Sequence, residues 1–193
     1  MEWLKEVLYF FECTVVYRSV YESEISMGNT STGGLEVDFL GKSGRNLRRL
    51  INAGYEVFPV VILGSDLLGR ICMEYLKKMG CLTDYIGQDS GETNFVFVLE
   101  VKGKRRAIYK YIREMSGKQC AQYRHYYKEA LGRRQCSALF AEDMTWILGD
   151  QQNKAQCMGR EGRRLYTLTG TERLTALGSR EEINRLEEVL RKE

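Results

Sequence analysis

The chain has 193 residues, of which 44% are hydrophobic and 28% are charged, and its formal net charge at pH 7 is +3. This composition is typical of a folded, soluble protein and excludes an intrinsically disordered chain. The small net charge gives no general electrostatic reason to expect a nucleic acid as the partner.

The cysteines and the first residues bear on metal binding and location. Six cysteines are scattered along the chain, none forms a C-x-x-C pair, and His125 is the one histidine, so the spacing predicts no metal site. Scattered thiols without a secretory leader predict a cytoplasmic protein. The opening stretch MEWLKEVLYFFECTVVY is interrupted by Lys5, Glu6 and Glu12 and is too charged and too short for a membrane span. We expect no membrane association and a buried first helix or strand.

A loop and a short helix are expected next. Residues 29–34 (NTSTGG) have the composition of a turn, and the alternating apolar and polar residues after them stop at Gly41 and Gly44. Asn46 is a candidate N-cap for a helix that Gly54 would end. The apolar face of this helix would hold Leu47, Leu50 and Ile51.

A buried strand followed by a capped helix is the clearest pattern. Residues 57–63 form a nearly continuous apolar, β-branched run, which is typical of an interior strand in a covered parallel sheet. Ser65 or Asp66 can cap the following helix, and Gly80 can end it. Its expected core stripe is Leu68, Cys72, Tyr75, Leu76 and Met79. Helix, strand and helix joined by short loops predict an α/β fold of layered βα units.

A β-hairpin and a mainly helical region are expected in the rest of the chain. Residues 93–101 and 105–112 alternate apolar and polar side chains on either side of the turn 102–104. A composition shift near residue 113 marks a boundary, and residues 113–193 are expected to be mainly helical. The elements expected there are a helix over 115–134, a buried strand over 144–149, a strand and turn over 165–171, and a final helix with a capping box of Ser179 and Glu182.

Four short motifs occur in an order that is more specific than any of them alone. They are LGKSGRN (40–46), AGYEV (53–57), VILGSDLLGR (61–70) and the hairpin that ETNFVFVLEVKGKRR opens. Over residues 40–112 this order resembles the ribokinase or PfkB family of carbohydrate kinases. Those proteins carry G-G-x-x-x-N, then G-[DN]-D-x-x-G, then a β segment that begins with Thr. The resemblance implies a partial ribokinase-like (Rossmann-like) fold over residues 1–112, with a lid hairpin near 93–112.

The resemblance also implies a ligand and a site. The ligand would be a small sugar or nucleoside, because glycines let the backbone approach a ligand closely and an asparagine amide can donate to and accept from hydroxyl groups. The implied substrate-binding residues are Gly41, Lys42, Asn46 and Thr93, and the implied motif turn is Gly64, Asp66 and Gly69. The hairpin would close over the substrate and exclude water. In many members the lid is also the dimer contact, so a homo-oligomer is expected.

Three departures from the family pattern bear on activity. Lys42 stands where the second glycine of the first motif is expected, and it would extend a charged side chain toward the substrate. Residues 14–25 offer no match to the aspartate that binds the sugar after the family's first strand. The G-A-G-D segment, whose aspartate is the general base and whose helix N-terminus stabilises the transferred phosphoryl group, also has no match. Gly149-Asp150 and residues 170–172 lack its flanking glycines.

These departures imply a truncated sugar-kinase homologue that cannot transfer phosphate alone. Such a chain would bind no cofactor by itself, and ATP and Mg²⁺ would take part only if a second chain supplied the catalytic half. The expected partners are therefore a small sugar or nucleoside and either a second copy or a complementing chain.

Two other functions stay open. The edge of the hairpin could pair with another chain, which would make the protein a non-catalytic oligomerisation module. Basic stretches that contain tyrosines fit stacking on single-stranded RNA, although a solvated charged surface explains them more simply. These stretches are 102–113, 124–134 and 159–164. Asp143 and Asp150 flank the strand expected at 144–149, and chance placement explains them better than paired acid–base chemistry.

Overall fold

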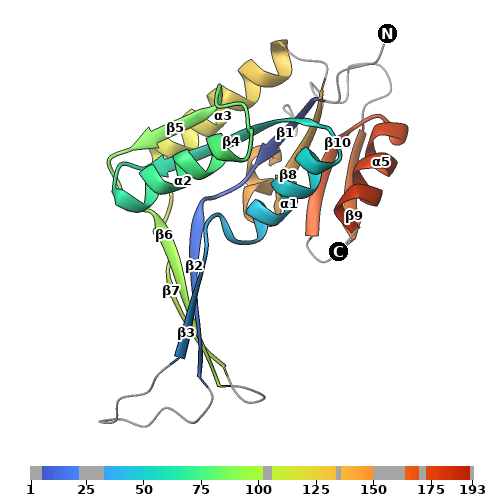
Figure 1. Ribbon diagram of the computed structural model, residues 1–193. Helices are drawn as coiled ribbons and strands as arrows, with labels where there is room; N and C mark the ends of the chain where they lie inside the picture. Colours follow the sequence, from blue (N-terminus) through green and yellow to red (C-terminus); the bar gives the residue numbers. More distant parts are fainter. Residues whose placement is uncertain are drawn as a thin grey trace.

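The computed structural model describes residues 6–21, 33–101, 106–133, 136–149, 164–169 and 173–191. Two β-sheets organise these residues: a six-stranded sheet in the body of the molecule and a four-stranded sheet that projects from it (Figure 1). The body strands lie in the order β5 (Ile86–Asp89), β4 (Glu56–Gly64), β1 (Glu6–Phe10), β8 (Ser137–Ala141), β10 (Arg173–Gly178) and β9 (Arg164–Thr169). The opening stretch thus contains a buried strand, β1, in the middle of the sheet.

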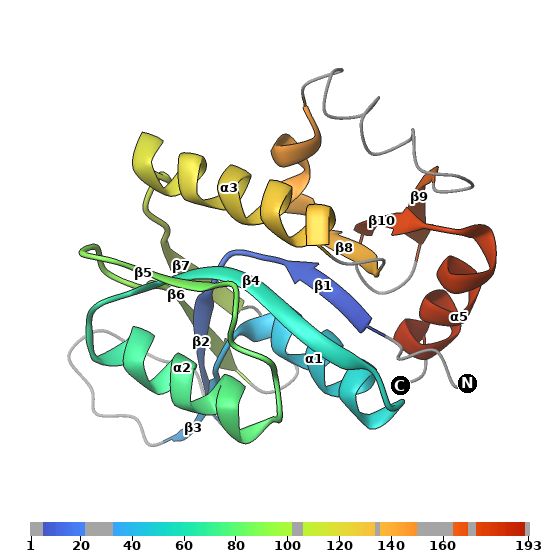
Figure 2. The ribbon, with the colours of Figure 1, turned by 90° about the horizontal axis from the view of Figure 1, so that it is seen from above.

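Helices cover both faces of the body sheet (Figure 2). One face carries α1 (Gly41–Asn52), α2 (Leu67–Lys78) and α5 (Arg180–Arg191), and the other carries α3 (Gly117–Arg133) and the 3-10 helix η1 (Glu142–Leu148). The side chains of β4 alternate between the two cores, with Val61 on the α1 and α2 side and Ile62 on the α3 side. Every residue of β4 after Glu56 is buried. The predicted α/β class and the interior strand are therefore confirmed.

The projecting sheet consists of the predicted hairpin and two further strands, and we name it the lid sheet. Its order is β3 (Gly33–Asp38), β2 (Thr14–Tyr21), β6 (Asn94–Val101) and β7 (Arg106–Tyr111). β6 and β7 are antiparallel, as the hairpin prediction requires, and β2 runs parallel to β6 and antiparallel to β3. Because β2 follows β1 after residues 11–13, one segment of chain passes directly from the body into the lid sheet.

Two helices, α2 and α5, begin where the sequence predicts. Asp66 is the N-cap of α2, and Gly80, with φ +85°, follows its end. In the predicted capping box of α5, the Glu182 amide donates to Ser179 Oγ (3.3 Å) and the Ser179 amide donates to Glu182 Oε2 (2.9 Å). Helix α3 covers most of the helix expected over 115–134. These local signals decide the structure because each satisfies backbone groups at a helix end.

Two local predictions are wrong. Helix α1 begins at Gly41, so Asn46 is a buried residue inside the helix rather than its N-cap. Residues 144–149 do not form a strand, because this segment belongs to η1 and the strand of the region is the preceding β8. Several apolar side chains of η1 are buried beneath α3, and a short apolar run alone does not distinguish a strand from a helix.

The C-terminal region extends the body sheet. β8 pairs in parallel with β1, β10 pairs antiparallel with β8, and β9 pairs antiparallel with β10. Residues on both sides of position 113 thus share one sheet, and a division of the chain there stays a prediction. The turns expected at 102–104 and 170–171 and most of the loop at 29–34 lie outside the described residues. None of the helices in the described ranges is both long and apolar enough to cross a membrane.

Candidate functional site

A cavity of about 530 Å³ lies where the lid sheet meets the body. Its body side is formed by segments that follow β1 and β8, by β10 and by the first turn of α1, and its lid side is formed by β2 and β6. The lining residues are Glu12, Thr14, Val16, Leu40, Gly41, Lys42, Ser43, Val96, Ala141, Asp143 and Leu174. A cavity of this size can hold a small organic ligand.

The first turn of α1 reaches the cavity because Gly41 permits an unusual backbone. Leu40 has φ 70° and Gly41 has φ +50°, so the chain turns sharply from β3 into the helix. A Cβ on Gly41 would lie 3.2 Å from Val16 Cγ2 of β2, closer than most side chains approach one another. Glycine therefore allows α1 and the lid sheet to meet closely at the cavity wall.

Two carboxylates line the cavity, Glu12 just after β1 and Asp143 in η1. Asn94 Nδ2 donates a hydrogen bond to Glu12 Oε1 at 2.6 Å. Burial raises the pKa of Glu12, the bond from Asn94 acts in the opposite direction, and the negative charge of Asp143 raises the pKa further. Glu12 is therefore a half-buried acceptor that Asn94 holds in position.

Neither acid was assigned to the site from the sequence. The resemblance places a sugar-binding aspartate within residues 14–25, whereas the acid in the cavity is Glu12, directly after the buried strand EVLYF. That position was an available signal, because ligands of parallel sheets bind at the carboxyl ends of the strands. Asp143 follows β8, the neighbour of β1, so the pairing of these strands brings both acids to one edge of the sheet.

The implied substrate-binding residues divide into two pairs. Gly41 and Lys42 line the cavity, and Asn46 and Thr93 do not. Asn46 is buried in α1, where its Nδ2 donates to Tyr9 Oη at 3.1 Å. Its observed contact supports packing between α1 and β1, and a contact between Asn46 or Thr93 and a substrate stays a prediction.

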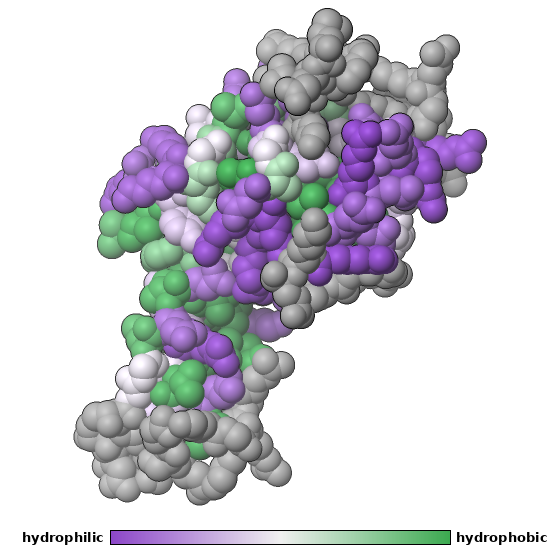
Figure 3. Space-filling view, turned by 45° about the vertical axis from the view of Figure 1, so that its right-hand side comes forward, coloured by the Kyte–Doolittle hydropathy of each residue, from purple (hydrophilic) through white to green (hydrophobic). Residues whose placement is uncertain are grey.

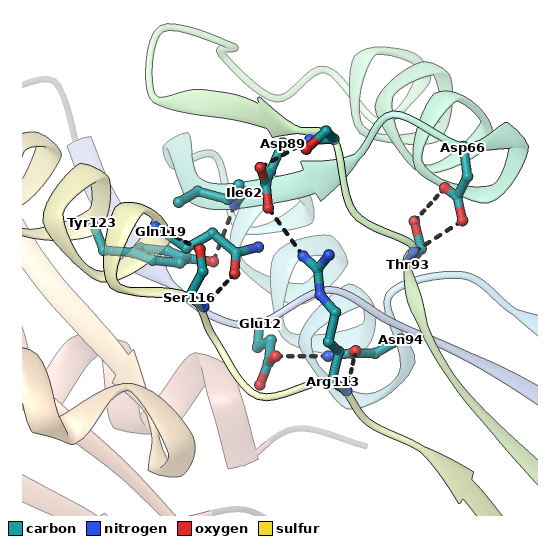
Figure 4. A network of polar contacts seen from close by, with 11 residues as sticks. Glu12, Ile62, Asp66, Asp89, Thr93, Asn94, Arg113, Ser116, Gln119 and Tyr123 are labelled. Atoms are coloured by element: carbon teal, nitrogen blue, oxygen red, sulfur yellow. Dashed lines mark hydrogen bonds and ion pairs between the residues drawn. The ribbon is translucent and has the colours of Figure 1, made fainter.

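The predicted motif turn joins α2 to the beginning of the lid sheet (Figure 4). Asp66 Oδ1 accepts from the Gly69 amide (2.8 Å) and from Thr93 Oγ1 (2.6 Å), and Asp66 Oδ2 accepts from the Thr93 amide (2.9 Å). Desolvation raises the pKa of Asp66, but these hydrogen bonds lower it by more, so the net shift is downward. Asp66 and Thr93 are therefore in direct contact, and this contact joins α2 to the start of β6.

A second polar chain anchors the hairpin where it leaves and re-enters the body (Figure 4). Asn94, the first residue of β6, bonds to Glu12 through its Nδ2 and accepts from the Arg113 amide through its Oδ1 (2.9 Å). Arg113 Nη2 in turn lies 3.0 Å from Asp89 Oδ2, at the end of β5. Both ends of the hairpin are thus tied to the ends of body strands, through Glu12 after β1 and through Asp89 of β5.

Two of the described helices have N-termini that are unsuited to a phosphate group. A nucleotide phosphate needs a glycine-rich turn and a helix N-terminus with free amide groups. Among the described helices, α2 is capped by Asp66, and the first turn of α5 carries Glu181 and Glu182, whose charges repel phosphate. Two segments were compared with the G-A-G-D pattern in the sequence. Of these, Gly149 ends η1, whereas Asp150 and residues 170–172 lie outside the described residues.

Comparison with known proteins identifies similar structures but no similar sequence. No protein-family model matches the chain, and no curated protein matches it. A Clostridium perfringens protein assigned as a sugar kinase is 17% identical with a TM-score of 0.53, over 63% of this chain and 40% of that protein. A carbohydrate kinase from Agrobacterium tumefaciens is 16% identical with a TM-score of 0.52, over 75% of this chain and 49% of that protein. A Staphylococcus aureus protein assigned as a phosphofructokinase is 13% identical with a TM-score of 0.52, over 64% of this chain and 39% of that protein.

These similarities concern the fold, since the sequence identities are low and the alignments span less than half of each of these three proteins. The matched architecture is the layered α/β fold that the motif order implies. The chain has a ribokinase/PfkB-like sugar-kinase fold that corresponds to part of the length of those proteins.

Proposed function

We propose that this chain binds a small sugar or nucleoside in the cavity between the body and the lid sheet and does not transfer phosphate by itself. The observation that carries the proposal is the cavity lining, which combines two carboxylates, Glu12 and Asp143, with the glycine turn of α1. Carboxylate oxygens accept hydrogen bonds from hydroxyl groups, and a sugar or ribose presents several hydroxyls close together. Neither α2 nor α5 has an N-terminus suited to a nucleotide phosphate, which supports binding without phosphoryl transfer.

Binding is expected to depend on Glu12. In the Glu12→Gln variant the amide oxygen can still accept from Asn94, but the anionic acceptor for ligand hydroxyls is lost. Because a hydrogen bond to a charged group contributes about 1.5–3 kcal/mol, we expect the Kd to rise by about tenfold or more. Titration calorimetry over pentoses, hexoses and nucleosides, with and without ATP, measures this and detects any turnover.

The same variant separates binding from stability. Burial raises the pKa of Glu12 above its usual 4.5, so the charged carboxylate destabilises the fold increasingly as the pH rises through the folded-state pKa. Glu12→Gln is therefore expected to be more stable than the wild type at neutral pH, with a difference that disappears below about pH 4.5. If no sugar or nucleoside binds to the wild type, or if Glu12→Gln binds as tightly, the proposed function is wrong.

A second proposal is that two copies associate through the outer face of the lid sheet. Strand pairing places Val37, Tyr17, Phe97 and Tyr109 in one row on the face opposite to Val16 and Val96 of the cavity. The Tyr17 and Phe97 rings stack at 4.8 Å, and Tyr109 remains 64% exposed. Figure 3 shows hydrophobic residues gathered on the projecting sheet. The exposed apolar residues of this sheet and the segment after it are Leu35, Val37, Phe97, Leu99, Ile108, Tyr109 and Ile112.

Association through this face predicts a dimer that one charge disrupts. Because a buried, unpaired carboxylate is costly, Phe97→Glu is expected to produce monomers in light scattering at concentrations where the wild type is dimeric. Ile108→Glu is the matched control, since Ile108 is exposed on the opposite face of the same sheet and should not alter association. A wild type that is monomeric at high concentration would exclude this proposal.

RNA binding is less well supported than either proposal. In the second basic stretch, Tyr127 is buried against Phe10 and Phe140, and Tyr126 packs beside Tyr85, so these rings are not free to stack on bases. We also propose a cytoplasmic location, in agreement with the free thiols among the described cysteines, most of which are buried.

A further inference from the structure

We infer that the ligand of the cavity carries an anionic group, a carboxylate or a phosphate, which Lys42 binds. The inference rests on the proposed function and narrows it from any small polyhydroxylated compound to a sugar acid or a sugar phosphate.

The position of Lys42 is the first observation. It is the second residue of α1, it lines the cavity, and it is exposed. Within the described residues Lys42 forms no ion pair, unlike Lys77, whose Nζ lies 2.8 Å from Glu74 Oε1 on α2. Its ammonium group is therefore available to a ligand in the cavity.

The positive and negative groups of the cavity come from different elements. Lys42 belongs to the first turn of α1, whereas Glu12 and Asp143 follow β1 and β8. A ligand that binds to both Lys42 and the two carboxylates must present a negative charge to the lysine and hydroxyl donors to the carboxylates.

The neighbours of Lys42 are compatible with an anion. The first turn of α1 contains no acidic residue, and no side chain caps its amide groups. Ser43 also lines the cavity, and its Oγ accepts a hydrogen bond of 3.4 Å from Tyr9, which leaves the Ser43 hydroxyl proton free to be donated. The dipole of α1 adds a favourable positive potential at this end of the helix.

The charge of the ligand is tested by binding of matched compounds to the wild type. The probes are ribose against ribose 5-phosphate, fructose against fructose 6-phosphate, glucose against gluconate, and inorganic phosphate alone. We expect at least one phosphorylated or acidic sugar to bind about tenfold more tightly than its neutral partner, with a preference that weakens as salt is added. Inorganic phosphate alone should bind more weakly, because it does not engage the carboxylates.

Variants test whether Lys42 is the group responsible. Lys42→Met is expected to remove the tenfold preference for the charged compound over its neutral partner, and Lys42→Arg should retain that preference. Lys78→Met, which removes a lysine from the last turn of α2 outside the cavity lining, is the control and should leave the preference unchanged.

The outcomes distinguish this inference from the proposed function. If neutral sugars bind as tightly as their charged partners, or if Lys42→Met still prefers the charged compounds, the inference is overturned. The proposed function, binding of a sugar or nucleoside in the cavity, is then unaffected. If inorganic phosphate binds as tightly as the sugar phosphates, the cavity recognises an anion alone and the inference fails as well. If no compound binds, both the inference and the proposed function are wrong.

Discussion

Replacing Gly69 with alanine is expected to lower the free energy of unfolding by about 3 kcal/mol, because α2 and β4 touch at this position. A Cβ on Gly69 would lie 1.9 Å from the carbonyl oxygen of Gly64 and 2.7 Å from its carbonyl carbon. Both are backbone atoms, so relief requires the start of α2 to move away from the end of β4. The gain of about 1 kcal/mol from the higher helix propensity of alanine is too small to offset this clash.

The measurement is urea unfolding followed by circular dichroism, with a second glycine as the control. Gly117 is the first residue of α3, and a Cβ built there has no neighbour within 4 Å. Gly117→Ala should therefore leave stability unchanged or raise it slightly. A Gly69→Ala protein as stable as the wild type would show that α2 and β4 can separate without cost and that the last glycine of the motif is not required for packing.

Replacing Asp66 with alanine is expected to cost about 2 kcal/mol, because this carboxylate caps α2 and also holds the beginning of β6. The variant would leave the Gly69 and Thr93 amides without their present acceptor. Asp84→Ala is the control, since Asp84 is exposed in the turn before β5 and its replacement should have little effect.

The effect of Asp66→Ala is also expected to depend on pH. The hydrogen bonds that outweigh desolvation keep the folded-state pKa of Asp66 below its usual 3.8, so the stabilisation is complete above that value. As the pH falls below 3.8 and through the folded-state pKa, the carboxylate is protonated and the wild type loses this advantage. Unfolding experiments across an acidic pH series should show the gap between wild type and variant shrinking, and a gap that grows in acid would contradict the assignment.

Local signals were sufficient for the elements whose ends are fixed by one or two side chains. Asp66 caps α2, and Ser179 and Glu182 cap α5, in both cases through contacts between residues close in sequence. The start of α1 could not be predicted in this way, because no side chain caps it. Its first turn depends on the positive φ angles of Leu40 and Gly41, and leucine gives no local sign that it will adopt such a conformation.

The candidate site was harder to predict because it is assembled from distant parts of the chain. Gly41 and Lys42 could be placed through a motif, but Glu12 and Asp143 meet only because β1 and β8 pair side by side. The strand β2 was missed as well, and Gly33 and Gly34 begin β3 although they have the composition of a turn. Pairing partners separated by long stretches of chain leave no periodic signal in either stretch.

The central place of β1 has a consequence for how the chain folds. Residues 6–10 are synthesised before both of their neighbours in the sheet, which are residues 56–60 and 137–140. Contacts between such distant residues require closure of long loops and are typical of slow folding. Until β8 has been made, a nascent chain leaves one edge of a strongly apolar strand uncovered, and such edges readily associate with other chains. Synthesis of this protein is therefore expected to pass through a stage that is sensitive to aggregation and ends only when residues near 140 become available.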